Sequence, residues 1–198
     1  MISLVIATRN LGKVKEFKEI LTGLPFEVLS LLDFPQCPEI IEDGDTFQEN
    51  AVIKAQALND FTECIVLADD SGLEVDYLKG SPGVYSARFA GEGATDEENN
   101  KKLLQLMSHV PWEQRGAQFT CVIAISRPQK ETVVIKGSCR GIITREPRGN
   151  MGFGYDPLFL VQEYGKTFSE LGPEIKNNIS HRGNAMKKAI EVLKGFVE

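Results

Sequence analysis

The segment Leu4–Glu16 constrains the fold most, because a short apolar run there gives way to a polar turn and then to a helical pattern. An apolar run that ends in turn residues is typical of a buried strand. Asn10 and Gly12 are expected to form the turn, and Thr8 or Asn10 to cap the helix. A helix N-terminus favours phosphate, and Lys13 adds a positive charge there. The segment is not a Walker A loop, because the Gly-Lys-Ser/Thr ending is missing. The alternative to a phosphate site is an ordinary first strand–helix unit of an α/β fold.

The composition fits one domain, or one domain with two lobes, that can bury a sizeable core. The chain has 198 residues, of which 42% are hydrophobic, and a formal net charge of −6. This negative charge argues against a nucleic-acid-coating role, and an anionic substrate would need a local basic patch or a metal ion. No run approaches the roughly 18 apolar residues of a membrane helix, and we expect no signal peptide.

The cysteines and histidines do not suggest a structural metal site. The chain has four cysteines without a Cys-x-x-Cys pair and only two histidines, so zinc is not expected. Buried free thiols suit a reducing compartment, and we expect a cytoplasmic protein.

Hydrophobic periodicity predicts strand–helix units in the first half and a long hairpin in the second. Thr46 and Glu49 form a capping-box pattern, and Thr95 is expected to cap a later helix. Such an order predicts an α/β fold with a mixed sheet and two lobes around a central cleft. The predicted helices are 14–21, 46–59, 96–107 and one from Ser180, and the predicted strands are 4–8, 25–32, 64–68, 118–126, 132–144 and 158–161.

Asp69-Asp70-Ser71-Gly72 follows a buried strand, at the usual position of a ligand in an α/β sheet. Successive strand residues point to opposite faces, so we expect one catalytic carboxylate and one that orders a turn. The alternative is a turn with purely local hydrogen bonds.

The acidic loop around Glu42, Asp43 and Asp45, with Glu49 nearby, offers hard oxygen ligands. Mg²⁺ prefers one or two carboxylates together with phosphate oxygens and water, although a solvated acidic loop would have the same composition.

Two further segments complete the pattern. Gly152–Pro157 offers aromatic faces that can stack on a purine, or else it is a bend with two core aromatics. Lys176 and Ser180–Gly183 place cationic groups at the start of the last helix, which favours an anion unless the His-Arg pair is structural. Together these features indicate a nucleoside polyphosphate held with Mg²⁺.

Six motifs carry a family resemblance over nearly the whole chain. They are Thr8–Glu16, Asp43–Ala55, Ala68–Leu73, Pro82–Arg88, Gly152–Pro157 and Ile179–Gly183. In this order they resemble the inosine triphosphate pyrophosphatase family, also called the Ham1 family.

The resemblance implies hydrolysis of ITP, dITP and XTP to the monophosphate and pyrophosphate by a Mg²⁺-dependent homodimer. It also implies a single two-lobed domain over 1–198 with an elongated mixed sheet flanked by helices. A non-catalytic nucleotide sensor and a stepwise nucleotide phosphatase are the alternatives. The products formed when the protein is incubated with ITP and Mg²⁺ would distinguish these three functions.

The resemblance also assigns the site residues. Asp70 is the expected catalytic residue and, with Glu42, a metal ligand. Arg9 stands where many relatives have a small residue, and it either adds a phosphate contact or points to solvent. The other expected substrate-binding residues are Thr8, Asn10, Leu11, Gly12, Lys13 and Lys54 for the phosphates, Ser71, and Phe153, Gly154, Tyr155, Asp156, Lys176, His181 and Arg182 for the base.

Overall fold

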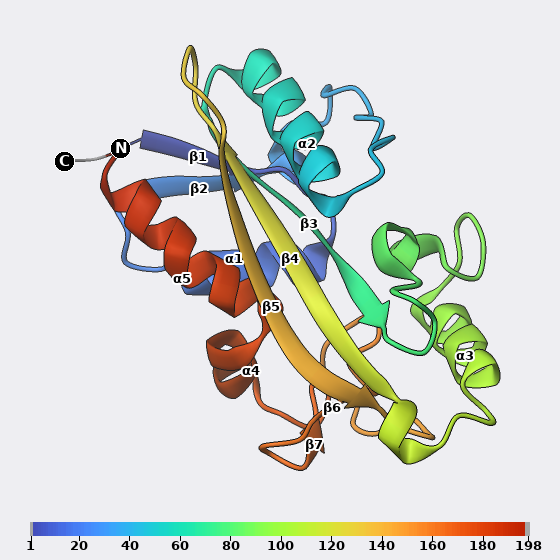
Figure 1. Ribbon diagram of the computed structural model, residues 1–198. Helices are drawn as coiled ribbons and strands as arrows, with labels where there is room; N and C mark the ends of the chain where they lie inside the picture. The colour runs from blue at the N-terminus through green and yellow to red at the C-terminus, as the bar shows by residue number, and fades with distance from the viewer. Residues whose placement is uncertain (1, 197–198) are drawn as a thin grey trace. The chain divides into compact units, whose positions relative to one another are not determined.

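A computed structural model describes residues 2–196, and within them one seven-stranded sheet has the order β2-β1-β3-β4-β5-β6-β7 (Figure 1). Strand β1 pairs in parallel with β2 and β3, whereas β6 pairs antiparallel with β5 and β7. This mixed sheet confirms the predicted fold class. The strands are β1 Ile2–Ile6, β2 Phe26–Ser30, β3 Ile65–Val75, β4 Gly116–Ser126, β5 Val133–Ile143, β6 Phe159–Val161 and β7 Lys166–Thr167.

Most of the helices begin at the predicted caps. Asn10 caps α1 by accepting a hydrogen bond from the backbone N–H of Lys13, and Thr46 forms the expected capping box with Glu49. Thr95 caps α3 in the same way. The helices are α1 Leu11–Ile20, α2 Phe47–Thr62, α3 Asp96–Leu106, α4 Pro173–Ile179 and α5 His181–Lys194, and the 3₁₀ turns are η1 Leu31–Asp33, η2 Gly83–Arg88 and η3 Trp112–Gln114.

The chain divides into two compact units. The first runs to Asp70 and also takes in Cys121–Gly137 and the chain from Gly183 onward. The second comprises Ser71–Thr120 and Ser138–Arg182. The central cleft and the single-domain organisation stay predictions.

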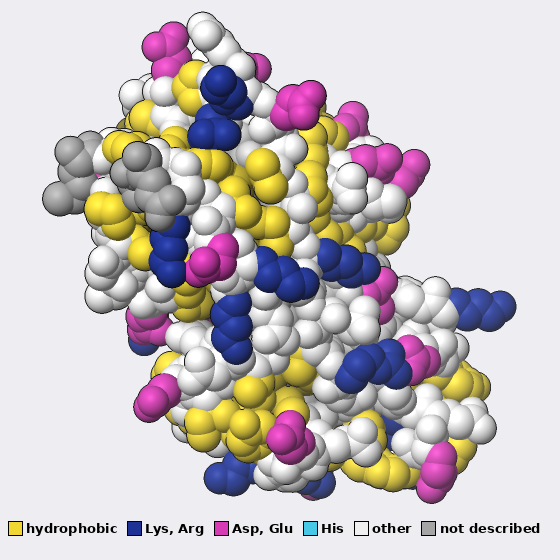
Figure 2. Space-filling view, turned by 60° about the vertical axis from the view of Figure 1, so that its left-hand side comes forward, with side chains coloured by type: hydrophobic (Ala, Val, Ile, Leu, Met, Phe, Trp, Pro, Cys, Tyr) yellow, Lys and Arg dark blue, Asp and Glu magenta, His cyan; other side chains and the backbone are white. Residues whose placement is uncertain are grey.

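The described surface carries both signs of charge. Figure 2 shows Lys and Arg side chains interspersed with acidic and hydrophobic ones on one face. Among residues 2–196, none of the helices has the length and apolar character needed to span a bilayer.

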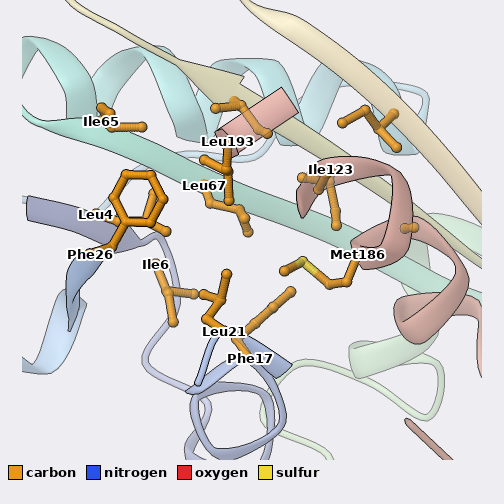
Figure 3. Packing of buried hydrophobic residues seen from close by; sticks show 14 of the residues in the cluster. Leu4, Ile6, Phe17, Leu21, Phe26, Ile65, Leu67, Ile123, Met186 and Leu193 are labelled. Atoms are coloured by element: carbon orange, nitrogen blue, oxygen red, sulfur yellow. The ribbon is translucent and has the colours of Figure 1, made fainter. Parts of the chain in front are cut away.

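In the first unit, α1 and α5 cover one face of the strands. Leu4, Ile6 and Leu67 point from β1 and β3 toward Phe17 of α1 and Met186 of α5, as Figure 3 shows. Helix α5 packs here through Ala185, Ala189 and Leu193, which are fully buried. Helix α2 lies on the other side of these strands (Figure 1), and its Ala51 and Ala55 are buried, whereas Ala57 is exposed. This packing on both faces of the strands fixes the position of the turn between β1 and α1.

The core of the second unit consists of aromatic and aliphatic side chains from β3 to α4, including Phe119, Phe159 and Phe168. Arg115 is also buried there. Its guanidinium donates hydrogen bonds to the carbonyl oxygens of Met107, Ile143 and Thr144 at 2.6, 2.6 and 2.8 Å. A longer bond of 3.4 Å reaches the Val110 carbonyl. Main-chain dipoles thus surround this charge and join the end of α3 to the end of β5.

Three local predictions are wrong. The chain does not turn at Asp69–Gly72, because β3 continues from Ile65 to Val75. Gly12 lies inside the first turn of α1 rather than in a turn before it. The final helix is preceded by a separate short helix, α4, which ends before Ser180. Asp70 and Ser71 are therefore consecutive residues of one strand.

Candidate functional site

The N-terminal end of α1 combines a side-chain cap with a nearby ammonium group. Asn10 caps the helix, and its own backbone N–H donates to the Thr8 hydroxyl over 3.2 Å. Leu11 and Gly12 are the first two helical residues, where backbone N–H groups have no preceding carbonyl to bind. This end of the helix can therefore receive an anion, as the sequence predicts.

Lys13 connects this helix to β3 through a buried ion pair. Its Nζ lies 2.8 Å from Oδ2 of Asp69, whose side chain is fully buried. Asp69 was expected to order a turn, but the structure gives it the task of holding Lys13. Because removing one partner of a buried pair costs about 3–5 kcal/mol, this contact fixes the position of the ammonium group.

A second lysine joins the acidic loop to the same strand. Lys54 of α2 forms a 2.7 Å ion pair with Glu42 and donates a 3.0 Å hydrogen bond to the carbonyl of Asp69. Asn50, one turn earlier, accepts from the Gly44 N–H at 2.8 Å and donates to Oδ2 of Asp70 at 3.3 Å. One face of α2 therefore holds both the loop and the carboxylate.

Asp70 has the most perturbed carboxylate of this group. Burial raises its pKa from 3.8 to about 6, while the positive charges of Lys54 and Lys13 oppose that rise and Glu42 adds to it. The carboxylate is mostly ionised at neutral pH, yet it is a stronger base than an exposed aspartate.

Arg9 is exposed to solvent, which is one of the two positions expected for it. Its guanidinium donates a 3.1 Å hydrogen bond to the carbonyl of Cys37 and so supports the loop that leads to Glu42. Leu11 is largely exposed.

In the second unit, a buried ion pair forms beneath the glycine-rich loop. Asp156 accepts from Lys176 at 2.6 Å and from the backbone N–H of Phe153 at 3.0 Å. The Lys176 ammonium lies 5.0 Å from the centre of the Phe153 ring. A side chain at Gly152 would overlap the Asp156 carboxylate, so glycine is required there. The loop is thus held with its aromatic ring beside a cation.

His181 and Arg182 begin α5 as predicted, and both are buried. The His181 ring stacks on Phe119 with centroids 4.6 Å apart. The Arg182 guanidinium lies 5.5 Å from the Phe153 ring centre and donates a 3.2 Å hydrogen bond to the Ser71 hydroxyl. The Arg182 guanidinium thus lies beside the Phe153 ring, a pairing of a cation with an aromatic face that suits recognition of a ligand.

Tyr155 does not offer a face for stacking, contrary to the expectation. Its ring is 4% exposed within the second core, and its hydroxyl donates a 2.8 Å hydrogen bond to the Ser86 carbonyl. Burial raises the pKa of this hydroxyl far above its usual value, so it stays protonated. Only Phe153 of this aromatic pair is partly exposed.

The residues that sequence reasoning overlooked are buried amides. Asn50 orients Asp70, while Asn99 and Asn100 of α3 bind backbone groups of two loops. Asparagine inside a helix has low intrinsic helix propensity, and this signal could have marked all three positions.

The first unit therefore gathers two lysines, a helix N-terminus and a basic carboxylate, a combination that can bind phosphates and accept a proton. The second unit presents an aromatic face beside buried cationic donors.

Comparisons with known proteins show which family the chain resembles. The Ham1 family model matches residues 4–192. The dITP/XTP pyrophosphatase of Desulforamulus reducens is 57% identical over 190 residues, which cover 96% of this chain and 94% of that protein. That of Geobacter sulfurreducens is 54% identical and covers 94% of each chain.

Two solved structures have the same fold. The Ham1 protein of Staphylococcus aureus is 43% identical, with a TM-score of 0.87 and 98% of each chain covered. The HAM1 protein of Coxiella burnetii is 41% identical, with a TM-score of 0.89, and covers 98% of this chain and 100% of its own.

Proposed function

Because the chain belongs to the Ham1 family, we propose that it is a nucleoside triphosphate pyrophosphatase that hydrolyses dITP, ITP and XTP. The products are the nucleoside monophosphate and pyrophosphate. The observation that carries this proposal is the basic carboxylate of Asp70, placed among the charges of Lys13, Lys54 and Glu42. A site for binding alone has no need of a half-buried carboxylate with a raised pKa.

The triphosphate is assigned to the first unit. Thr8, Asn10 and Gly12 shape the start of α1, where backbone N–H groups can donate to phosphate oxygens. The ammonium groups of Lys13 and Lys54 offset the charge of the phosphates. Both lysines are held by ion pairs, so little rearrangement is needed when negative charge develops on the leaving group.

Mg²⁺ is the proposed cofactor, with Glu42 and Asp70 as its ligands. Within residues 2–196, no three acidic, histidine or cysteine side chains gather into a site that could hold a metal alone. The pair still fits Mg²⁺, which takes one or two carboxylates and completes its shell with phosphate oxygens and water. When bound, the ion supplies neutralisation of phosphate charge.

Asp70 acts as the general base. Its carboxylate accepts a proton from the water that attacks the α-phosphorus, the bond between that phosphorus and the bridging oxygen breaks, and pyrophosphate leaves. Asn50 orients the carboxylate through the 3.3 Å hydrogen bond. Lys13 and Lys54 stabilise the charge on the departing group.

The purine is assigned to the second unit. Phe153 offers a face to the ring, and Lys176, His181 and Arg182 supply hydrogen-bond donors for a 6-oxo group, with the Ser71 hydroxyl beside Arg182. A 6-amino group would bring a donor instead of an acceptor toward these donors, which is a means of rejecting adenine.

A homodimer and a cytoplasmic location complete the proposal, and the family resemblance supports both. Light scattering coupled to size-exclusion chromatography tests the first, and cell fractionation tests the second.

Product analysis tests the proposed function. Incubation of ITP with the protein and Mg²⁺ should yield IMP and pyrophosphate, and Asp70→Asn should lower kcat at least ~10²-fold. Release of IDP and phosphate would indicate a stepwise phosphatase. Nucleotide binding without turnover would favour a sensor.

A further inference from the structure

Helix α3 holds the Phe153–Asp156 loop by both backbone polar groups of a single residue, Gly154. Asp96, the first residue of the helix, accepts a 2.7 Å hydrogen bond from the Gly154 N–H. Asn100 donates a 2.9 Å hydrogen bond to the Gly154 carbonyl. These two residues are four apart and therefore share one face of the helix. The backbone on either side of Gly154 is thus fixed from α3.

The Asn100 side chain makes its hydrogen bond through the amide nitrogen, which donates to Gly154. It is nine-tenths buried, and within residues 2–196 its amide oxygen accepts no hydrogen bond. A half-satisfied buried amide destabilises a fold, which indicates that the bond to Gly154 serves a function.

The loop has space to move if these bonds are lost. A cavity of about 730 Å³ lies between α3 and the loop, and its lining includes Asp96, Asn100, Met151 and Phe153. Because this volume is not filled by side chains, apolar packing does not hold the loop against the rest of the helix. The two hydrogen bonds therefore have a large share in fixing the loop.

Phe153 is the residue whose position depends on this arrangement. The backbone N–H of Phe153 donates to the Asp156 carboxylate. The next backbone N–H, that of Gly154, donates to Asp96, so the peptide bonds before and after Phe153 are both held. Its ring lies 5.0 Å from the Lys176 ammonium and 5.5 Å from the Arg182 guanidinium. A displaced loop would move the ring away from both cations.

We infer that Asp96 and Asn100 are positioning residues for base recognition, acting through Gly154 on the Phe153 ring. This inference rests on the proposed function. It assigns to α3 a role in binding the purine, and none in binding the triphosphate or in the proton transfer at Asp70.

The test compares Asp96→Ala, Asp96→Asn and Asn100→Leu with a matched control, Glu97→Gln. The control removes the same charge from the same helical turn, so it reproduces any loss of the favourable interaction with the helix dipole. Calorimetry measures the binding of IMP and of pyrophosphate separately, and kinetics with ITP gives KM and kcat.

Asp96→Ala should raise KM for ITP and Kd for IMP by roughly 10-fold, the low end for losing a hydrogen bond to a charged group. Asp96→Asn keeps an oxygen acceptor, so it should raise KM for ITP and Kd for IMP by roughly 3-fold. Asn100→Leu should raise both constants by the same factor. Pyrophosphate binding and kcat should change by less than about 2-fold, and Glu97→Gln should behave as wild type. Melting temperatures identify any variant that fails to fold.

Equal weakening of IMP and pyrophosphate binding would overturn the inference, because the effect would then be a general loss of structure. So would unchanged IMP binding in Asp96→Ala, or an equal loss in Glu97→Gln. If the wild-type protein fails to convert ITP to IMP and pyrophosphate, the proposed function fails instead, and the IMP measurements still report on the loop.

Discussion

Replacing Asp70 by asparagine should make the metal-free protein more stable while it inactivates the enzyme. Burial raises the pKa of Asp70 from 3.8 to about 6, despite the opposing charges of Lys54 and Lys13. At neutral pH the folded protein therefore carries an ionised group that its surroundings disfavour. One pKa unit corresponds to about 1.4 kcal/mol, so the shift of about two units corresponds to at most about 3 kcal/mol.

The direction of this stability change with pH follows from the number of protons that the folded and unfolded states bind. Between pH 3.8 and about 6 the folded protein keeps a proton on Asp70 that the unfolded chain has released. The corresponding stability is complete below the lower value and is lost as the pH rises through the higher one. Asparagine matches the protonated carboxyl in size and does not titrate. Asp70→Asn should equal wild type near pH 4 and exceed it near pH 8 by up to about 3 kcal/mol, or roughly 6–12 °C in Tm.

Thermal unfolding in EDTA, followed by circular dichroism from about pH 4 to about pH 8, measures this difference. Asp69→Asn is the matched control, because the neighbouring carboxylate is fully buried against Lys13 at 2.8 Å. It should be destabilised by about 3–5 kcal/mol at neutral pH, the opposite sign. A constant gap between wild type and Asp70→Asn across the pH range, or destabilisation by both substitutions, would refute the reasoning.

Three further predictions concern activity. Excess EDTA should abolish turnover of ITP, because an acidic protein needs a cation to hold a triphosphate, and full activity without divalent ions would exclude Mg²⁺ from the mechanism. Lys13→Ala should lower kcat/KM for ITP by roughly 10- to 150-fold, the value of a charge-assisted bond. Lys15→Ala, on the exposed side of the same helix, should have no effect, and equal behaviour of the two variants would place Lys13 outside the site. Arg182→Ala should lower kcat/KM more for ITP than for ATP; equal losses with ITP, XTP, GTP and ATP would assign Arg182 to phosphate binding.

Local interactions made much of the fold predictable from the sequence. A capping box needs only Thr46 and Glu49, three residues apart, and the apolar run of β1 lies within a few residues. The chain order of strands and helices then determined the mixed sheet. Lys13 was proposed as a site residue from its place near a helix start, and it lies in the first turn of α1. Asp70 was proposed from an expected strand end, but β3 continues past it to Val75.

The predictions failed where contacts between distant segments override local preference. Asp69, Asp70, Ser71 and Gly72 favour a turn by themselves, but β3 lies between β1 and β4 in the sheet, and pairing keeps it extended. Helix α4 is too short to show a clear period. The bond from Gly154 to Asp96 joins residues 58 positions apart, a separation at which sequence pattern gives no signal.

The buried Arg115 has a consequence for which substitutions the second unit can accept. Its hydrogen-bond partners are the carbonyl oxygens of Met107, Val110, Ile143 and Thr144, which every amino acid possesses. Changes of side chain at those four positions therefore leave the bonds available, as long as the backbone keeps its course. Arg115 itself has no substitute, because the single ammonium of a lysine cannot direct donors toward carbonyls on both sides of a planar fork. Mutational tolerance around this charge is thus strongly one-sided, with one irreplaceable donor and four interchangeable acceptors.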